Sequence, residues 1–559
     1  MNIYNSLNFV GEDTRVRKFL LPAKIVEFGG NIENVESLLN KKSLQIGLCE
    51  TEFTTLRNTE NGENSYIILD FGIELHGGVR ILNYTTSDTT YFGEIEPEIK
   101  ITFGESYSEA NSNIGEKGSC NDHSPRQFTV TIPALSDNEW GQTGFRFVRI
   151  ELLTPNTIIK LKNVLAMSIM HNFEYKGSFE CSDETINQIY DVAAYTTHLC
   201  LQNMVWDGIK RDRLVWIGDM MPESMTIRSV FGDIDLVNES LDFVCEQTPL
   251  PNWMNNIPSY SMWWIMILKD WYMSSGNPSF IESHREYILG LLKQLCDSVL
   301  DNGEDTLPSY FVDHPTTYNP ANKNGVRALL KIALKDGAFL CEKLEEPELS
   351  ALCLKKSDAI TPISDFGGAK QIAAFLSLAD MIDKTEAYNA ITTDGDKRFS
   401  TFLSYFILKA IALAGKDEEA LAYLKSYYKD MLDKGATSFW EDYNTEWTEG
   451  SGNLYSPTAD GEKDIHGDFG DYCYVGFRHS FCHGWSSGPV PFLVERVLGV
   501  NVIEPGCKKI KIEPHLSGLS WAKGTYPTPY GNVEIEHKLG ADGKVITKFN
   551  APKEVEIIL

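Results

Sequence analysis

The spacing of hydrophobic residues changes twice along this chain of 559 residues, and this limits the folds that it can adopt. Up to about residue 172, short runs such as 145–152 alternate apolar and polar side chains. Beyond that point, as in 284–300, apolar residues recur every three to four positions, and after about residue 500 the alternation returns. Because alternation is typical of half-buried strands and the longer spacing of amphipathic helices, the sequence predicts a helical domain between two antiparallel β domains.

Three domains are therefore expected, in a chain several times longer than one typical domain. The predicted parts are an N-terminal β-sandwich domain at 1–172, an all-α domain at 173–499 and a C-terminal β-sandwich domain at 500–559. Turn residues between the alternating runs favour antiparallel sandwiches. An all-α domain of this length, built from helical hairpins, suggests a ring of paired helices, although periodicity alone does not determine whether the ring closes.

Two helix boundaries are clearly marked. Ser182, followed by Asp183 and Glu184, combines an N-cap hydroxyl with acids at the positive end of the helix dipole, so a helix is predicted to start there. The segment 416–434 has three acids near its start and one apolar face, and Gly435 is placed to end it.

The formal net charge of −28 argues against two classes of partner. Such a surface repels phosphate backbones and anionic lipids, so neither a nucleic acid nor a membrane partner is expected. No run of eighteen apolar residues is present, and the N-terminus lacks the apolar core of a secretion signal. These features predict a cytoplasmic or periplasmic location and leave a homo-oligomer open.

The cysteines and histidines do not form a recognisable metal site. Eleven cysteines are scattered through the chain with no C-x-x-C pair, which suits buried free thiols better than a disulfide framework. No cysteine and histidine spacing fits zinc, and no aspartate-rich loop fits calcium. The sequence therefore predicts no metal and no other cofactor.

One segment of the helical region, 206–219, concentrates reactive side chains. Three aspartates, three cations and two tryptophans share fourteen residues. Carboxylates of this kind bind hydroxyl groups or move protons, and an indole face stacks on the apolar face of a sugar ring. The alternative is a salt-bridged helix start with core tryptophans. Asp212 and Asp219 would share a face if the segment were helical.

Two further segments carry candidate residues. Glu441 follows Trp440 directly after the helix that Gly435 ends, so it is expected on a loop at the rim of the helical domain. His483 lies in 480–485, where the alternative is a hydrogen-bonded structural histidine. Nine of the eleven tryptophans fall between residues 206 and 485, which favours a carbohydrate groove over a uniformly stocked core.

These segments, in this order, resemble the inverting α-L-rhamnosidase family. Its signature is an aspartate, a basic stretch, a catalytic acid, Arg-Leu-Gly-Trp and Gly-Asp, and 207–219 matches it position by position, with one departure at the acid and one at the glycine. The segment 435–441 resembles the family's Gly-Ala-Thr-x-x-Trp-Glu, and 311–315 resembles its Gly-Asp-Trp loop. The resemblance continues outside the helical region, at 70–81, 144–150, 504–514 and 524–531.

The resemblance implies a central (α/α)6 barrel flanked by β-sandwiches, and a glycosidase that hydrolyses terminal α-L-rhamnosyl or similar deoxysugar bonds with inversion. Asp212 would be the general acid and Glu441 the general base. The carbohydrate would be held by a further set of residues, namely Asp207, Arg211, Asp219, Trp216, Trp264, Asp313, Trp440 and His483.

Two departures from the family pattern bear on this interpretation. The family's acid is usually a glutamate, and the shorter Asp212 can misplace the proton by about an ångström, at a cost on the order of a hundredfold in rate. Val215 replaces the usual glycine, and Glu223 is an alternative acid. Two other hypotheses therefore remain: another exo-glycosidase or a lyase on the same fold, and a carbohydrate-binding protein without catalytic activity.

Overall fold

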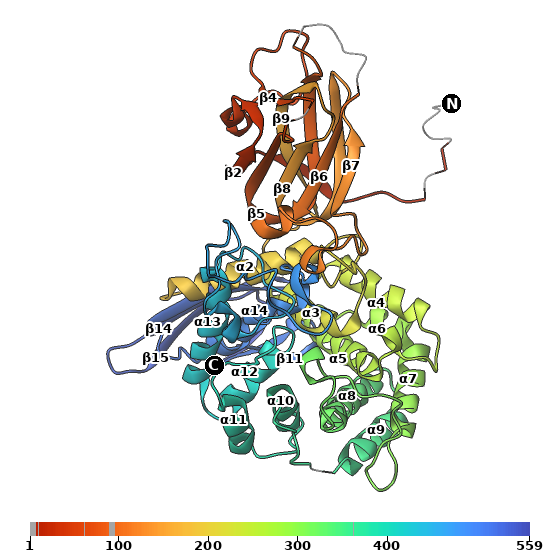
Figure 1. Cartoon of the computed structure of the whole chain (residues 1–559). Helices are drawn as coiled ribbons and strands as arrows, with labels where there is room; N and C mark the ends of the chain where they lie inside the picture. The colour runs from red at the N-terminus through yellow and green to blue at the C-terminus, as the bar shows by residue number, and fades with distance from the viewer. Residues whose placement is uncertain (1–6, 9, 61, 89–95, 362) are drawn as a thin grey trace.

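The computed structural model describes residues 7–8, 10–60, 62–88, 96–361 and 363–559. An N-terminal β domain stands on one side of a helical domain, and two C-terminal sheets pack beside the helices (Figure 1). Residues 1–6 and 9, on which the expectation about a secretion signal partly depends, lie outside the described residues. In the described parts, no helix combines the length and apolar character needed to cross a bilayer.

The N-terminal domain is an antiparallel sheet of nine strands centred on β5, which pairs with β2, β8 and β9. This strand joins the short apolar run at 66–72 and the alternating run at 79–84, with register shifts between Asp70 and Leu75 and again between Gly77 and Val79. The strands are β1 (Val16–Leu20), β2 (Lys24–Gly29), β3 (Asn31–Glu33), β4 (Thr54–Asn58), β5 (Tyr66–Thr85), β6 (Glu98–Gly104), β7 (Gln127–Thr131), β8 (Ser136–Leu152) and β9 (Thr157–Met170). A short helix, α1 (Tyr107–Ala110), follows β6. The alternation that predicted these strands places a separate hydrophobic core inside this domain.

The helical domain follows in sequence and contains the larger hydrophobic core. Its helices are α2 (Glu184–Cys200), α3 (Ile217–Val230), α4 (Asp235–Gln247), α5 (Pro258–Ser275), α6 (Pro278–Ser283), α7 (Arg285–Asp297), α8 (Asn322–Lys343), α9 (Pro347–Ala359), α10 (Lys370–Leu378), α11 (Lys384–Thr392), α12 (Ser404–Leu413), α13 (Asp417–Asp433) and α14 (Pro489–Phe492). Contacts run from α3 to α5, α8, α10, α12 and α14 in turn, and α14 also contacts α3. The hairpin partners α9, α11 and α13 pack on α8, α10 and α12 (Figure 1).

The helix boundaries agree with the sequence signals, with one shift in the cap. Helix α2 is capped by Asp183, whose carboxylate accepts the N–H of Thr185 at 3.0 Å, so the predicted Ser182 lies one residue too early. Helix α13 ends as predicted, with Gly435 in the left-handed region at φ 100°. These ends matter for the site because the loops that follow α2 and α13 carry the candidate residues.

The C-terminal sheets recruit one strand from far upstream. Strand β10 (Ser178–Cys181) pairs antiparallel with β13, although it lies within the residues predicted as helical. Four residues are too few for alternation to be recognised, so the sequence pattern did not reveal this strand. The remaining strands are β11 (Val500–Glu504), β12 (Lys509–Ile512), β13 (Trp521–Thr528), β14 (Gly531–Leu539), β15 (Val545–Asn550) and β16 (Glu556–Ile558). They form sheets in the order β10-β13-β14-β15 and β11-β12-β16.

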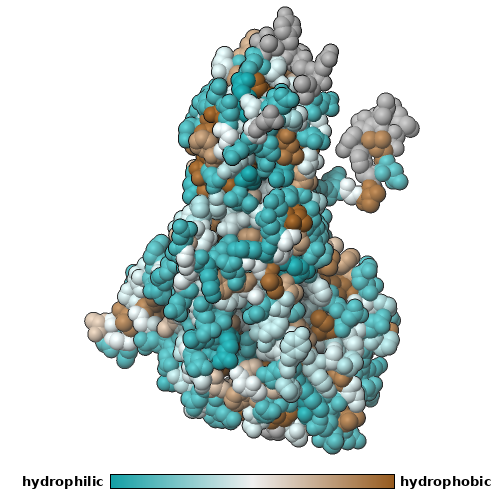
Figure 2. Space-filling model, viewed as in Figure 1, coloured by the Kyte–Doolittle hydropathy of each residue, from teal (hydrophilic) through white to brown (hydrophobic). Residues whose placement is uncertain are grey.

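Hydrophilic residues dominate the face of the molecule shown in Figure 2, and the hydrophobic residues of the described chain are scattered among them.

The N-terminal β domain contacts the helical domain through side chains as well as backbone. For example, the hydroxyl of Tyr195 on α2 donates to the Glu74 carbonyl at 2.7 Å, and the Glu74 N–H donates to the Thr437 hydroxyl at 2.8 Å. The two domains therefore meet close to the loop that follows α13.

Candidate active site

The segment 206–219 folds as a loop that leads into α3, not as a continuous helix. Asp207 closes this loop, because its carboxylate accepts the Leu214 N–H at 2.8 Å and its own N–H donates to the Leu214 carbonyl at 3.1 Å. Asp219 lies in the first turn of α3, where the helix dipole favours a carboxylate. Asp212 sits at the tip of the loop with a left-handed φ of 54°. It therefore does not share a helix face with Asp219.

Two distant loops are hydrogen-bonded to this segment. Gly208 and His483 form an antiparallel bridge, and the Gly484 N–H donates to the Asp207 carbonyl at 2.7 Å. The Glu441 N–H donates to the Ser480 carbonyl at 3.0 Å. Backbone hydrogen bonds thus connect the three segments that the sequence singled out, although the first lies more than two hundred residues before the other two.

His483 lies at the centre of three buried carboxylates. Its Nε2 is 3.6 Å from Asp207 Oδ2 and 3.5 Å from Glu441 Oε1, and its Nδ1 is 3.8 Å from Asp219 Oδ1. Burial disfavours the charged imidazolium, but Glu441 and the two aspartates outweigh it and raise the pKa of His483. The hydroxyl of Tyr260 on α5 donates to the Asp219 carboxylate at 3.3 Å.

Glu441 is held as a carboxylate by its neighbours. Arg211 Nη2 donates to its Oε1, and the Ser480 N–H donates to its Oε2 at 3.2 Å. Burial alone would raise the pKa of Glu441, but the charges of Arg211 and His483 overcome this effect and lower the pKa to about 2. A group that stays ionised at neutral pH can accept a proton, so Glu441 has the charge state of a base.

Asp212 faces a different environment from Glu441. Its side chain keeps 21% of its surface exposed, whereas that of Glu441 keeps 4%. Arg211 Nη1 lies 3.3 Å from Asp212 Oδ1, so one guanidinium contacts both candidate catalytic carboxylates. Asp212 also contacts His123 of the N-terminal β domain, with Oδ1 and Nδ1 2.8 Å apart.

Sequence reasoning did not identify His123 or Tyr260 as site residues. His123 lies in a polar loop of the N-terminal domain, and nothing in its local sequence signals a contact with a segment almost ninety residues away. Tyr260 lies on a largely apolar helix, where it looks like a core aromatic. Only the tertiary structure brings either residue to the site.

The three candidate tryptophans are placed differently from one another. Trp216, just before α3, is half-buried and meets Tyr260 edge-on with ring centroids 6.1 Å apart. Trp440 is 1% exposed and stacks on Phe481 at 4.2 Å, and Trp264 is fully buried against Tyr287. Of the three rings expected to contact a sugar, only Trp216 is accessible, because Trp264 and Trp440 are buried. Packing against neighbouring aromatic rings accounts for the other two.

Two acids proposed from the sequence are enclosed by protein. Asp313 is buried, accepts the His314 N–H at 2.8 Å, and has a pKa that burial raises to about 7. Glu223 on α3 is 1% exposed, and burial raises its pKa well above the usual range. It lies so close to Gly484 that a Cβ there would be 1.6 Å from its Oε1. Glu223 therefore contacts the backbone behind His483, whereas Asp212 reaches the surface.

One group of described residues has a composition that could ligate a metal. Glu105, Glu109 and His466 lie together, fully buried, between the N-terminal and helical domains. The ammonium of Lys210 is 3.3 Å from the Glu105 carboxylate and 2.8 Å from that of Glu109. Because Lys210 already supplies a positive charge at this position, the group is better described as an interdomain ion-pair network than as a metal site.

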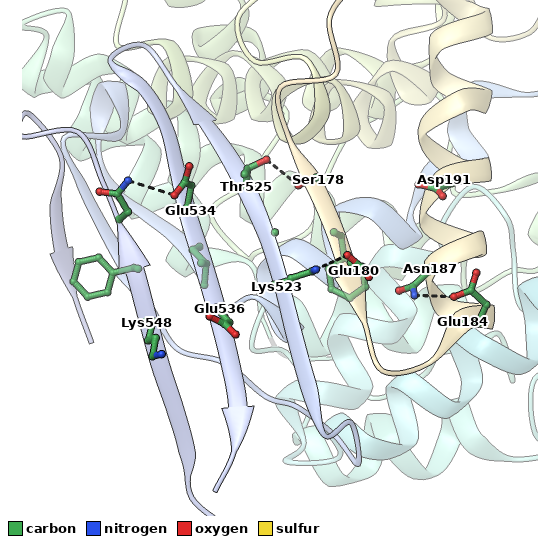
Figure 3. Close-up of a pocket in the computed structure, with 15 residues that line it drawn as sticks. Ser178, Glu180, Glu184, Asn187, Asp191, Lys523, Thr525, Glu534, Glu536 and Lys548 are labelled. Carbon is green, nitrogen blue, oxygen red and sulfur yellow. Dashed lines mark hydrogen bonds and ion pairs between the residues drawn. The ribbon is translucent and has the colours of Figure 1, made fainter.

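A groove of about 740 Å³ lies away from these residues, between α2 and the C-terminal sheet (Figure 3). Its polar side chains mostly contact one another. Lys523 pairs with Glu180 at 2.8 Å, and the hydroxyls of Ser178 and Thr525 are 2.9 Å apart. The residues that line it include none of the predicted site residues, so the candidate active site is the carboxylate cluster around His483 and Arg211.

A helical domain of this kind, flanked by antiparallel sheets and carrying clustered carboxylates, is similar to the six-hairpin glycosidases. Residues 174–328 match the bacterial alpha-L-rhamnosidase six-hairpin glycosidase domain, and residues 499–559 match the bacterial alpha-L-rhamnosidase C-terminal domain. Two stretches of the chain therefore match domains of bacterial α-L-rhamnosidases, which confirms the resemblance predicted from its motifs.

Individual proteins are similar to this chain in sequence or in fold. An alpha-L-rhamnosidase of Alteromonas sp. (strain LOR) is 24% identical over 463 residues, which cover 74% of this chain and 48% of that protein. A GH78 family rhamnosidase of Bacillus sp. GL1 has a similar fold, with a TM-score of 0.72 at 20% identity, over 93% of this chain and 55% of that one. A Klebsiella oxytoca rhamnosidase with rhamnose bound gives a TM-score of 0.64 at 18% identity, over 86% of this chain and 96% of that one. This chain thus spans about half the length of the first two relatives.

Proposed function

We propose that this protein is a glycosidase that hydrolyses terminal α-L-rhamnosyl bonds, or those of a similar deoxysugar, with inversion at the anomeric carbon. The observation that carries the proposal is that Arg211, within the residues matched by the six-hairpin glycosidase domain, contacts both Asp212 and Glu441. Inverting glycosidases need two carboxyl groups with room for one water between them, about 6.5–9.5 Å apart. Two carboxylates that share one guanidinium are close enough together for this task.

The two carboxyl groups have different proposed roles because their surroundings differ. Glu441 is ionised and buried, so it is the proposed base that takes a proton from the attacking water. Asp212 is partly exposed at the loop tip, so it is the proposed acid that protonates the leaving oxygen. As the bond breaks, the leaving oxygen gains the proton of Asp212 and the anomeric carbon gains the hydroxyl of the water.

The remaining polar residues are proposed to bind the sugar. Asp207, Asp219 and His483 form a buried polar cluster next to Glu441, and these groups are proposed to hydrogen-bond the hydroxyls of a neutral carbohydrate. Trp216 offers its accessible ring to the apolar face of the sugar. Asp313, one residue before His314, is proposed to bind the sugar from a neighbouring loop.

We also propose the finer architecture that the family implies. The succession of contacts through α3, α5, α8, α10, α12 and α14, and back to α3, supports an inner ring of an (α/α)6 barrel. The core enclosed by the N-terminal strands supports a β-sandwich in that domain. We propose domain boundaries near residues 172 and 500, with β10 as an upstream strand that belongs to the C-terminal sheets.

The direct test is hydrolysis of an aryl α-L-rhamnoside, followed by proton NMR during the first minutes of the reaction. We expect release of the phenol together with the β-anomer of rhamnose, because inversion places the new hydroxyl opposite the old bond. Aryl α-L-fucoside and α-L-arabinoside serve as matched controls for sugar specificity. First appearance of the α-anomer would contradict the roles assigned to Asp212 and Glu441.

A second candidate, a carbohydrate-binding protein without turnover, is favoured by one observation. The proposed acid is the shorter aspartate, and Arg211 already occupies its carboxylate and that of Glu441. Calorimetric titration with rhamnose distinguishes the two functions. Binding without hydrolysis of any aryl glycoside would support the second candidate, and hydrolysis would exclude it.

A further inference from the structure

The segment that holds Glu441 is itself held by a residue of the N-terminal β domain. Ser480 donates its N–H to Glu441 Oε2 at 3.2 Å and accepts the Glu441 N–H at 3.0 Å. The next residue, Phe481, donates its N–H to Glu105 Oε2 at 2.6 Å. Glu105 directly follows β6 of the N-terminal domain. A carboxyl group of one domain is therefore bound to the same short segment that binds the proposed base of the other.

Lys210 attaches this segment, 477–481, at two further points. Its ammonium donates to the Phe477 carbonyl at 2.7 Å and to the His479 carbonyl at 2.8 Å. The same ammonium lies 3.3 Å from the Glu105 carboxylate and 2.8 Å from that of Glu109. It therefore links both carboxylates of the N-terminal domain to the backbone of the segment.

A neutral histidine path also reaches the segment from the N-terminal domain. The hydroxyl of Ser106 lies 2.9 Å from Nδ1 of His466, and Nε2 of His466 lies 3.0 Å from the His479 carbonyl oxygen. Lys210 and His466 thus support the segment at its carbonyl groups. Among the described residues, however, Glu105 is the only hydrogen-bond acceptor for the Phe481 N–H.

These contacts are enclosed by protein. Glu105, Glu109 and Phe481 are at most 2% exposed, and Lys210 is 8% exposed. In such an interior, a donor that loses its acceptor has no water to replace it, and the cost falls on the local structure. Removal of the Glu105 acceptor should therefore displace the backbone around Phe481.

The contact with Phe481 does not require a particular charge on Glu105. Burial raises the pKa of Glu105 to about 7, with Lys210 opposing this rise and Glu109 adding to it. A carboxyl group keeps an acceptor oxygen whether or not it is ionised. Glu105 can therefore hold the Phe481 N–H on both sides of neutral pH.

His483, farther along the same loop, has supports of its own. Its N–H donates to the Phe439 carbonyl at 3.0 Å, and it forms an antiparallel bridge with Gly208. Neither contact passes through Glu105. Loss of the Glu105 contact should therefore affect the placement of Glu441 more than that of the groups proposed to bind the sugar.

We propose that Glu105 is a positioning residue for Glu441, so that the N-terminal β domain governs the placement of the proposed base. Glu105 acts through the Phe481 N–H, which fixes the adjoining Ser480 N–H against the Glu441 carboxylate. This proposal rests on the proposed function of Glu441 as the base. A base must lie within hydrogen-bond distance of the water that it activates, and a misplacement of about an ångström can cost about a hundredfold in rate.

The test replaces Glu105 by alanine and by glutamine. Glu105→Ala removes the acceptor, while Glu109 still pairs with Lys210, so the ammonium keeps a counter-ion. Glu105→Gln retains a carbonyl oxygen that can accept the Phe481 N–H. On an aryl α-L-rhamnoside, we expect Glu105→Ala to lower kcat by roughly tenfold to a hundredfold while KM stays within about threefold. Glu105→Gln should recover most of the loss.

Glu151→Ala is the matched control. Glu151 is a buried acid of the same β domain, and its partners Asn64, Lys100 and Arg149 all belong to that domain. Its loss should destabilise the domain but leave kcat within about twofold. An equal fall of kcat in Glu105→Ala and Glu151→Ala, or an effect of Glu105→Ala on KM alone, would overturn the proposal while leaving the proposed function intact.

Hydrogen exchange of the full chain tests the contact without turnover. In peptides that cover residues 478–483, we expect backbone amides to exchange about tenfold faster in Glu105→Ala and a few-fold faster in Glu105→Gln, but at the wild-type rate in Glu151→Ala. The glutamine variant keeps the shape of the side chain and serves if the alanine variant does not fold. Wild-type exchange of these peptides in every folded Glu105 variant would overturn the inference. Failure of the wild type to cleave any rhamnoside would instead contradict the proposed function.

Discussion

Replacing Arg211 by methionine is the most informative perturbation of this site. The methionine keeps an unbranched stem about as long as the aliphatic part of arginine but removes the charge that contacts Asp212 and Glu441. Glu441 would then be a buried carboxylate without its main counter-ion. The backbone hydrogen bond from Ser480 would remain, together with His483 at 3.5 Å.

The size of the effect follows from the pKa of Glu441. The pKa is lowered from 4.5 to about 2, which at about 1.4 kcal/mol per pH unit corresponds to about 3 kcal/mol in favour of the folded protein above pH 4.5. This contribution is lost as the pH falls from 4.5 through about 2, because the unfolded chain binds the proton first. Without the charge of Arg211, burial becomes the largest influence on Glu441, so the pKa of Glu441 should rise. Loss of one partner from a buried ion pair typically costs about 3–5 kcal/mol.

The assay is urea denaturation of wild type, Arg211→Met, Glu441→Gln and the double variant at pH 4 and pH 7. We expect Arg211→Met to lower the free energy of unfolding by about 3 kcal/mol at pH 7 and by clearly less at pH 4, where Glu441 can be protonated in the variant. The double variant should recover part of the loss, because no buried charge is left unpaired. Additive losses in the double variant, or a loss that does not depend on pH, would refute the argument that the ion pair governs Glu441.

Three further outcomes are expected. Glu441→Gln should preserve the fold and lower kcat by roughly a hundredfold to ten-thousandfold, the range for loss of a general base, as measured with an aryl rhamnoside and checked by circular dichroism. Asp212→Asn should abolish cleavage of poor leaving groups while sparing activated phenyl rhamnosides, and Glu223→Gln should retain near-normal turnover; the reverse pattern would make Glu223 the acid. Asp313→Asn should be more stable relative to wild type at pH 8 than at pH 5. The pKa of Asp313 is about 7 in the folded protein and 3.8 in the unfolded chain, so wild type loses stability as the pH rises from 3.8 through 7. Parallel pH profiles of Tm for the two proteins would contradict this.

The sequence was sufficient to predict a helical part between antiparallel sheets and to single out the segments that meet in the candidate site. The alternating run at 145–152 lies in β8, and the helix predicted at 416–434 became α13 with Gly435 after it. These predictions rest on local periodicity and capping, which a single sequence carries directly. The segment 206–219 could be recognised because it contains several candidate residues within a few positions.

The parts that were not predicted depend on contacts between distant residues. The burial of Trp264 and Trp440 results from ring packing against neighbours on other segments, and a tryptophan in a sequence looks the same whether it lines a groove or fills a core. The contact between His123 and Asp212 joins two loops of different domains. Neither periodicity nor motif spacing contains the information about which loops meet.

The origin of strand β10 has a consequence for how the chain is made. β10 is synthesised before the whole helical domain, but its partner β13 leaves the ribosome only after that domain is complete. Until then the edge of β10 has no strand beside it, and an unpaired edge next to α2 can pair with another nascent chain. During synthesis from the N-terminus, this sheet therefore cannot be completed until the residues of β13 have been made. Chains that terminate before β13 should aggregate, and supplying residues 499–559 as a separate polypeptide during their translation should rescue their solubility.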